Sequence, residues 1–139
     1  MRNPILNYQS LNTDLASLLL RILVGGLFIR YGYTKLAAFN DMLPMFGDPI
    51  GIGGKLSLIL VIFAELVCGF LVAIGFLTRL TVIPIFITMS IAFFVAHAND
   101  AFDAKSLVFV YWILSMVIFV LGSGKFSADR FLINKKRRY

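Results

Sequence analysis

Long apolar stretches separated by short polar segments dominate the chain. They predict four helices, over about residues 15–35, 56–77, 80–98 and 106–122. A bilayer core of about 30 Å requires about 20 helical residues, so each stretch can cross a membrane, the fourth with a short extension. The strict alternation typical of membrane β-barrel strands is absent. The pattern therefore predicts an all-α integral membrane protein, an antiparallel four-transmembrane-helix bundle in one domain over residues 1–139.

The composition agrees with lipid as the solvent. Of the 139 residues 60% are hydrophobic and 14% are charged, and the mean hydropathy is +0.90. Soluble domains carry about 25% charged residues, and a chain this short cannot bury such an apolar surplus in its own core. A soluble domain is excluded, and 14 Phe residues exclude a disordered chain.

The net charge of +6 is unevenly distributed. A basic tail beside a membrane span is typical of the cytoplasmic side, where it contacts anionic lipid, and this argues against a nucleic-acid partner. Three basic residues fall on the side of the first and third loops: Lys35, Lys55 and Lys105. Eight fall on the side shared by the termini and the second loop: Arg2, Arg79, Lys125, Arg130, Lys135, Lys136, Arg137 and Arg138. Both termini are therefore expected in the cytoplasm.

The segments between the spans carry their own signals. Residues 36–55 form a long, partly apolar loop, which either rests in the membrane interface or folds back over the bundle as a lid. Residues 123–139 are expected to form the basic cytoplasmic tail. Thr78 and Arg79 suit a tight turn between the second and third helices, while Tyr111 and Trp112 suit an interfacial aromatic belt.

Ionisable residues inside the spans are the candidate functional residues, because such groups are costly in a membrane and usually face the bundle interior. Arg21 lies in the first helix and Glu65 near the middle of the second. Since these helices run antiparallel, the two side chains are expected within one or two turns in depth and predict an Arg–Glu pair. The pair either fixes helix packing only or forms a polar cavity for a ligand, an ion or a proton.

Small residues accompany these charges. At 100° per residue, Gly25 and Gly32 share the face of Arg21 and Lys35 on the first helix, and Gly69 follows Glu65 on the second. Glycines allow close approach of helices in membranes, so these three are predicted packing positions.

Lys35 and His97 lie near the outer ends of their helices. Each is either an interfacial hydrogen-bonding residue or a ligand-binding residue at the outer mouth of the cavity. Arg30 is expected to extend toward the lipid headgroups. One His and one Cys exclude bis-histidine haem within one chain, a zinc site and a dithiol centre, so no catalytic or metal-binding residue is predicted. His97 is better suited to proton transfer, or to a hydrogen bond with a quinone oxygen, than to binding a metal or a haem.

Three segments together resemble the DoxX family, and they read RILVGGLFIRYGYTKL, FAELVCGFLVAIGFLTRL and GSGKFSADRFL. The resemblance implies a small bacterial inner-membrane protein with four helices. Relatives include the membrane subunit of a thiosulfate:quinone oxidoreductase, and the family is linked with oxidative stress and sulfur redox partners. By this resemblance the functional face comprises Arg21, Gly25, Gly32, Lys35, Glu65 and Gly69.

The favoured hypothesis is the integral membrane subunit of a redox or oxidative-stress system, at most the membrane part of a quinone-linked oxidoreductase. A quinone is the candidate ligand, bound by Arg21, Glu65, Lys35 and His97. A soluble redox partner would supply the electrons, because the sequence holds no redox centre. One alternative is a small proton-coupled transporter or channel that uses Glu65; another is a membrane scaffold without a ligand. A homodimer stays open, because four short helices enclose little space.

Overall fold

The computed structural model describes residues 11–136, which form helices and no strands. Arg2, Arg137 and Arg138, which were counted for the orientation, lie outside the described residues. In chain order the helices are α1 (Thr13–Ala37), α2 (Phe39–Met42), α3 (Gly54–Ile62), η2 (Phe63–Cys68), α4 (Gly69–Ile74), α5 (Thr78–Ile91), η3 (Ala92–Ala96), α6 (Phe102–Leu121) and α7 (Ala128–Lys136).

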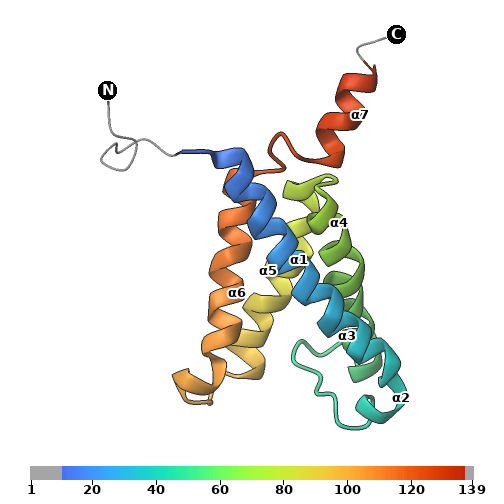
Figure 1. Ribbon diagram of the computed structural model, residues 1–139. Helices are drawn as coiled ribbons and strands as arrows, with labels where there is room; N and C mark the ends of the chain where they lie inside the picture. The colour runs from blue at the N-terminus through green and yellow to red at the C-terminus, as the bar shows by residue number, and fades with distance from the viewer. Residues whose placement is uncertain (1–10, 137–139) are drawn as a thin grey trace.

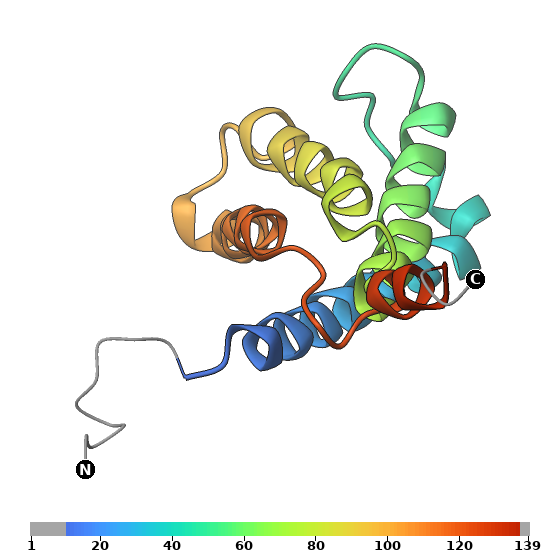
Figure 2. The ribbon, with the colours of Figure 1, turned by 90° about the horizontal axis from the view of Figure 1, so that it is seen from above.

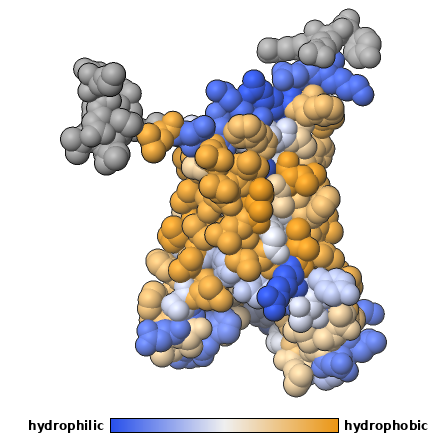
Figure 3. Space-filling model, in the orientation of Figure 1, coloured by the Kyte–Doolittle hydropathy of each residue, from blue (hydrophilic) through white to orange (hydrophobic). Residues whose placement is uncertain are grey.

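Four continuous helical spans are long and apolar enough to cross a membrane, namely Thr13–Ala37, Gly54–Ile74, Thr78–Ala96 and Phe102–Leu121. The chain passes down through α1, up through α3 to α4, down through α5 and up through α6 (Figure 1). An apolar band covers the middle of the molecule and polar residues gather at both ends (Figure 3). We name these ends the loop end, where α2 lies, and the tail end, where α7 lies. The prediction of an all-α protein with four apolar spans is confirmed.

Several predicted boundaries are wrong. The turn between the second and third spans comprises residues 75–77, and Thr78 and Arg79 are already in α5. Gly75 ends α4 with a left-handed backbone (φ 76°), a conformation that glycine adopts without strain. The fourth span begins at Phe102, four residues before the predicted start. The tail contains the helix α7, and the long loop contains the short helix α2.

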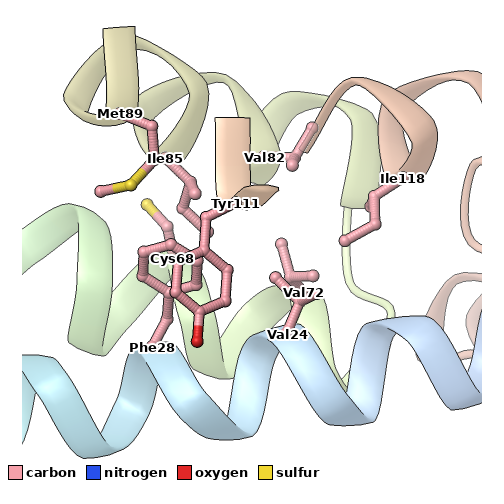
Figure 4. Close-up of a cluster of buried hydrophobic side chains, with 9 residues drawn as sticks. All are labelled: Val24, Phe28, Cys68, Val72, Val82, Ile85, Met89, Tyr111 and Ile118. Carbon is pink, nitrogen blue, oxygen red and sulfur yellow. The ribbon is translucent and has the colours of Figure 1, made fainter. Parts of the chain in front are cut away.

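The buried core joins all four spans (Figure 4). Its nine apolar side chains are Val24, Phe28, Cys68, Val72, Val82, Ile85, Met89, Tyr111 and Ile118. Tyr111 is buried and packs edge-on against the ring of Phe28, with the ring centroids 5.1 Å apart. Its assignment to an interfacial belt is therefore wrong, because its ring faces the other helices. Its hydroxyl lies 3.4 Å from that of Tyr31, which gives the polar end of the side chain a partner.

Glycines bring α1 against the second span. A Cβ added at Gly25 would lie 2.6 Å from the carbonyl oxygen of Gly69, and one at Gly32 would lie 2.6 Å from the backbone nitrogen of Leu66. Real Cβ atoms do not approach so closely, so larger residues would force the helices apart. These contacts fix how far the two spans are shifted along each other, and hence which side chains meet.

Candidate functional site

A cavity of about 570 Å³ lies toward the loop end, between the second and third spans. Most of its wall is apolar, and three of the lining residues, Leu60, Phe63 and Ile87, are about half exposed. The ionisable side chains in the wall are Lys35, Glu65 and His97. Ligand pockets are typically of this size, mostly apolar and equipped with a few polar groups.

An ion pair forms the polar part of the cavity wall. Lys35 Nζ, in the last turn of α1, donates to Glu65 Oε2 at 2.6 Å. Glu65 is 5% exposed and is the single glutamate of the chain. Within residues 11–136, no hydrogen bond is described for its second oxygen, Oε1. The pair can therefore offer a ligand both a donor, from the ammonium group, and an acceptor, from the carboxylate.

Two π-helical segments border the cavity. Glu65 lies in η2, while Ala92 and Ala96 line the cavity from η3. A π-helical turn inserts an extra residue, which widens the helix and shifts the side chains that follow; such segments are frequent at functional sites. Both spans that form the walls of the cavity therefore depart from α-helical geometry beside it.

His97 ends η3 at the mouth of the cavity. Its Nδ1 lies 2.6 Å from Asp100 Oδ2, and both side chains are nearly half exposed. Lys105 Nζ donates to the His97 carbonyl at 3.1 Å and holds this turn against the start of α6. His97 thus belongs to the cavity wall and is also partly exposed at the loop end.

The long loop also contributes to the cavity. Phe46, Pro49 and Ile50 line it, which favours the expectation of a lid over that of a loop resting on lipid. Asp48 holds the loop by accepting hydrogen bonds from the backbone N–H groups of Ile52 at 2.9 Å and Gly53 at 2.8 Å. The bond from Gly53, with the weaker ones, keeps the pKa of the Asp48 carboxyl below its ordinary value.

The predicted pair of Arg21 and Glu65 is wrong. Arg21 is fully buried near the tail end, where it donates to the carbonyl oxygens of Ala73 at 3.2 Å and Phe126 at 2.6 Å. The shift between the helices explains the difference. Because Gly25 lies against Gly69 and Gly32 against Leu66, Glu65 is level with the end of α1, about 20 Å from Arg21 along the helix axis. Arg21 joins the end of α4 to the tail and does not line the cavity.

A comparison with protein families assigns the chain to one of them. A sequence model of the family described as DoxX matches residues 16–98, more than half of the chain. The chain belongs to the DoxX family. Comparisons of this DoxX protein with curated proteins and with solved structures gave no match.

The region matched to DoxX contains the second and third spans and all but the first three residues of the first. It therefore includes Lys35, Glu65, His97 and the loop that covers the cavity, whereas α6 and α7 lie beyond it. The sequence left two alternatives for the loop of this DoxX protein, a loop resting in the membrane interface or a lid, because a loop leaves no periodic pattern that decides between them. The apolar residues at 46, 49 and 50, interrupted by Asp48 and followed by glycines, are the signal that was available.

Proposed function

We propose that this DoxX protein is the membrane subunit of a redox or oxidative-stress system and binds a lipid-soluble quinone in the cavity between its second and third spans. One observation carries the proposal: the buried pair of Lys35 and Glu65 lies in the wall of an otherwise apolar cavity. An apolar ring and tail match the wall, while the ring oxygens match the pair.

The pair suits both oxidation states of such a ligand. Lys35 donates to the carbonyl oxygen of a quinone, and Glu65 Oε1 accepts from the hydroxyl of a quinol. In an apolar wall these bonds are stronger than in water. A ligand that exchanges carbonyl for hydroxyl groups therefore keeps a partner in either state. The electrons come from a redox partner, since the chain belongs to a membrane bundle with no redox motif in its sequence.

The test uses the purified protein in nanodiscs and a short-tailed benzoquinone as the probe. Trp112 is the single tryptophan, and quenching of its fluorescence reports binding. Lys35→Met and Glu65→Gln are expected to weaken binding at least tenfold, because each removes a charged hydrogen-bonding group. Lys55→Met is the matched control, because Lys55 is exposed on α3 and does not line the cavity.

Mild extraction from native membranes provides a second readout. Mass spectrometry of the lipid extract is expected to find a quinone with the wild-type protein and the Lys55 variant, and none with the Glu65 variant. Equal quinone binding by all variants, or none by the wild type, would overturn the proposal. Proton uptake driven by a substrate gradient in proteoliposomes would instead support the transporter alternative.

A further inference from the structure

A second cavity, of about 470 Å³, opens at the tail end of the molecule. It has no residue in common with the first. Its walls come from the start of α5 and from the segment after α6. The first wall belongs to the sequence motif GFLTRL and the second to GSGKFSADRFL. Neither motif contributes a residue to the quinone cavity. The lining residues are Leu77, Thr78, Arg79, Leu80, Leu121, Gly122, Ser123, Gly124 and Asp129.

The first wall is the N-terminus of α5, a helix of 14 residues without a capping side chain. Asp129 Oδ1 accepts the N–H of Leu77 at 2.8 Å. The next two N–H groups, those of Thr78 and Arg79, have no hydrogen-bond acceptor within the described residues 11–136. Free N–H groups at a helix N-terminus carry partial positive charge and favour an anion.

A buried hydroxyl independently points to a missing partner. Thr78 is 1% exposed, and in the part of the chain that the structure describes its Oγ1 has no hydrogen bond. Buried hydroxyl groups in folded proteins nearly always have one. Thr78 lines this cavity, so an anion bound there would supply an acceptor for its hydroxyl.

Arg79 supplies a full positive charge on the same wall. Its Nε donates to the carbonyl oxygen of Phe119 at 3.2 Å, which holds the guanidinium against the end of α6. Gly122 lies beside the guanidinium, since a Cβ added there would lie 3.4 Å from that nitrogen, an ordinary van der Waals contact. The two terminal amino groups of the Arg79 guanidinium make no hydrogen bond to residues 11–136. An arginine with two free donors is suited to phosphate oxygens.

We propose that this cavity binds a phosphate group, held by the Thr78 hydroxyl, the free N–H groups of α5 and the Arg79 guanidinium. Asp129 also lines the cavity, and its negative charge opposes the binding of an anion. Its carboxylate already accepts the N–H of Leu77 and interacts electrostatically with Arg21. The residues that line the cavity belong to the tail end, where polar residues adjoin the apolar band (Figure 3), and we place the lipid headgroups at this boundary. The phosphate belongs either to a phospholipid or to a soluble phosphate.

The test compares two probes on the detergent-purified full-length chain: phosphatidylglycerol in maltoside micelles and inorganic phosphate. Native mass spectrometry counts the bound probe. Arg79→Gln is expected to weaken binding at least tenfold and Thr78→Val about threefold, while Arg79→Lys gives an intermediate loss. Arg130→Gln and Thr81→Val are the controls. Arg130 does not line the cavity, and the Thr81 hydroxyl is already bonded to backbone carbonyls.

The outcomes separate the two sources. Saturable binding of phosphatidylglycerol that Arg79→Gln and Thr78→Val weaken and the controls leave unchanged identifies a lipid site. The same dependence for inorganic phosphate alone identifies a soluble phosphate. Binding of neither probe, or equal binding by all variants, overturns the proposal. Size-exclusion chromatography verifies folding, and Arg79→Lys keeps the test valid should Arg79→Gln misfold. Quinone binding at the loop end is measured separately, so either proposal can fail alone.

Discussion

Arg21 illustrates how one buried cation can organise the end of a membrane bundle. Its guanidinium joins the carbonyls at the end of α4 to that of Phe126 after α6, two segments far apart in the sequence. Gly75 leaves it room, since a Cβ there would collide with the guanidinium. Arg21 is therefore assigned to the structure of the tail end rather than to ligand binding.

Arg21→Met is expected to lower the free energy of unfolding by about 2–4 kcal/mol, because buried carbonyl oxygens lose a charged donor while the apolar stem is kept. Partial proteolysis is expected to cut the segment after α6 earlier than in the wild type. Quinone quenching of Trp112 in the folded fraction stays at the wild-type level. A selective loss of quinone binding with normal stability would contradict this assignment.

The charged residues also show how far a sequence can predict a site. The sequence identified Lys35, Glu65 and His97 as candidates because charges inside spans are rare. It paired Glu65 with the wrong cation, since helical periodicity gives the face of a residue but not the axial shift between two helices. That shift depends on contacts such as Gly25 with Gly69, which only the packed structure shows.

At the scale of elements, local sequence signals predicted some helices well and missed others. Asn12 caps α1, its side chain accepting from the N–H of Leu15 at 3.0 Å, and a capping residue of this kind is a local signal. The spans were predictable because apolar length is a strong signal in a membrane protein. The helix α7 was not predicted, because its nine residues are few and include four charged ones, so it lacks the long apolar signal that identified the spans. The π-helical segments η2 and η3 were also missed, since they depend on packing rather than on composition.

The close contact between α1 and the second span yields a matched pair of substitutions. Gly25→Ala places a methyl group 2.6 Å from a backbone oxygen, whereas nothing lies within 4 Å of the corresponding position at Gly26. We expect Gly25→Ala to destabilise the protein by about 1–3 kcal/mol through overpacking. Gly26→Ala is expected to be neutral or stabilising by up to about 1 kcal/mol, owing to helix propensity. Thermal unfolding in one detergent compares the two; similar effects would refute the tight contact.

The loop over the cavity yields a prediction about pH. Hydrogen bonds to its ionised form depress the pKa of Asp48 from its ordinary value of 3.8. A depressed folded-state pKa means that the carboxylate stabilises the loop above the ordinary value and loses this effect as the pH falls through the lower one. The protection factors of the Ile52 and Gly53 amides, which correct for the intrinsic pH dependence of exchange, are therefore expected to be high at pH 5 and to fall below pH 3.8. Asp48→Asn should remove this pH dependence; a loop equally protected at both values would exclude the role of Asp48.

At the scale of the whole molecule, the charge distribution predicts the orientation in the membrane. Arg79, Lys125 and Arg130 lie at the tail end, which we therefore expect in the cytoplasm. The cavity for a quinone then opens in the outer half of the bilayer, and the proposed phosphate site in the inner half.

Cysteine labelling tests this orientation. Cys68 is buried, so it gives little background in intact cells. Asp103→Cys, at the exposed start of α6, is expected to react with a membrane-impermeant maleimide in intact spheroplasts. Arg130→Cys, in α7, is expected to react only after permeabilisation. The reverse pattern would invert the assignment and place both termini outside.

The two π-helical segments affect which insertions and deletions this bundle can tolerate as its sequence evolves. A turn of this kind holds one residue more than an α-helical turn. Deletion of a single residue between positions 63 and 68 would leave a span long enough for the bilayer. A deletion within an α-helical part of the span would rotate one half by about 100° relative to the other. Here the π-helical turn would become an α-helical turn, so the two halves would keep their faces and only the side chains of the turn, Glu65 among them, would change position. The cavity thus depends on the number of residues in its walls as well as on their identity, and a substitution scan would not reveal this constraint.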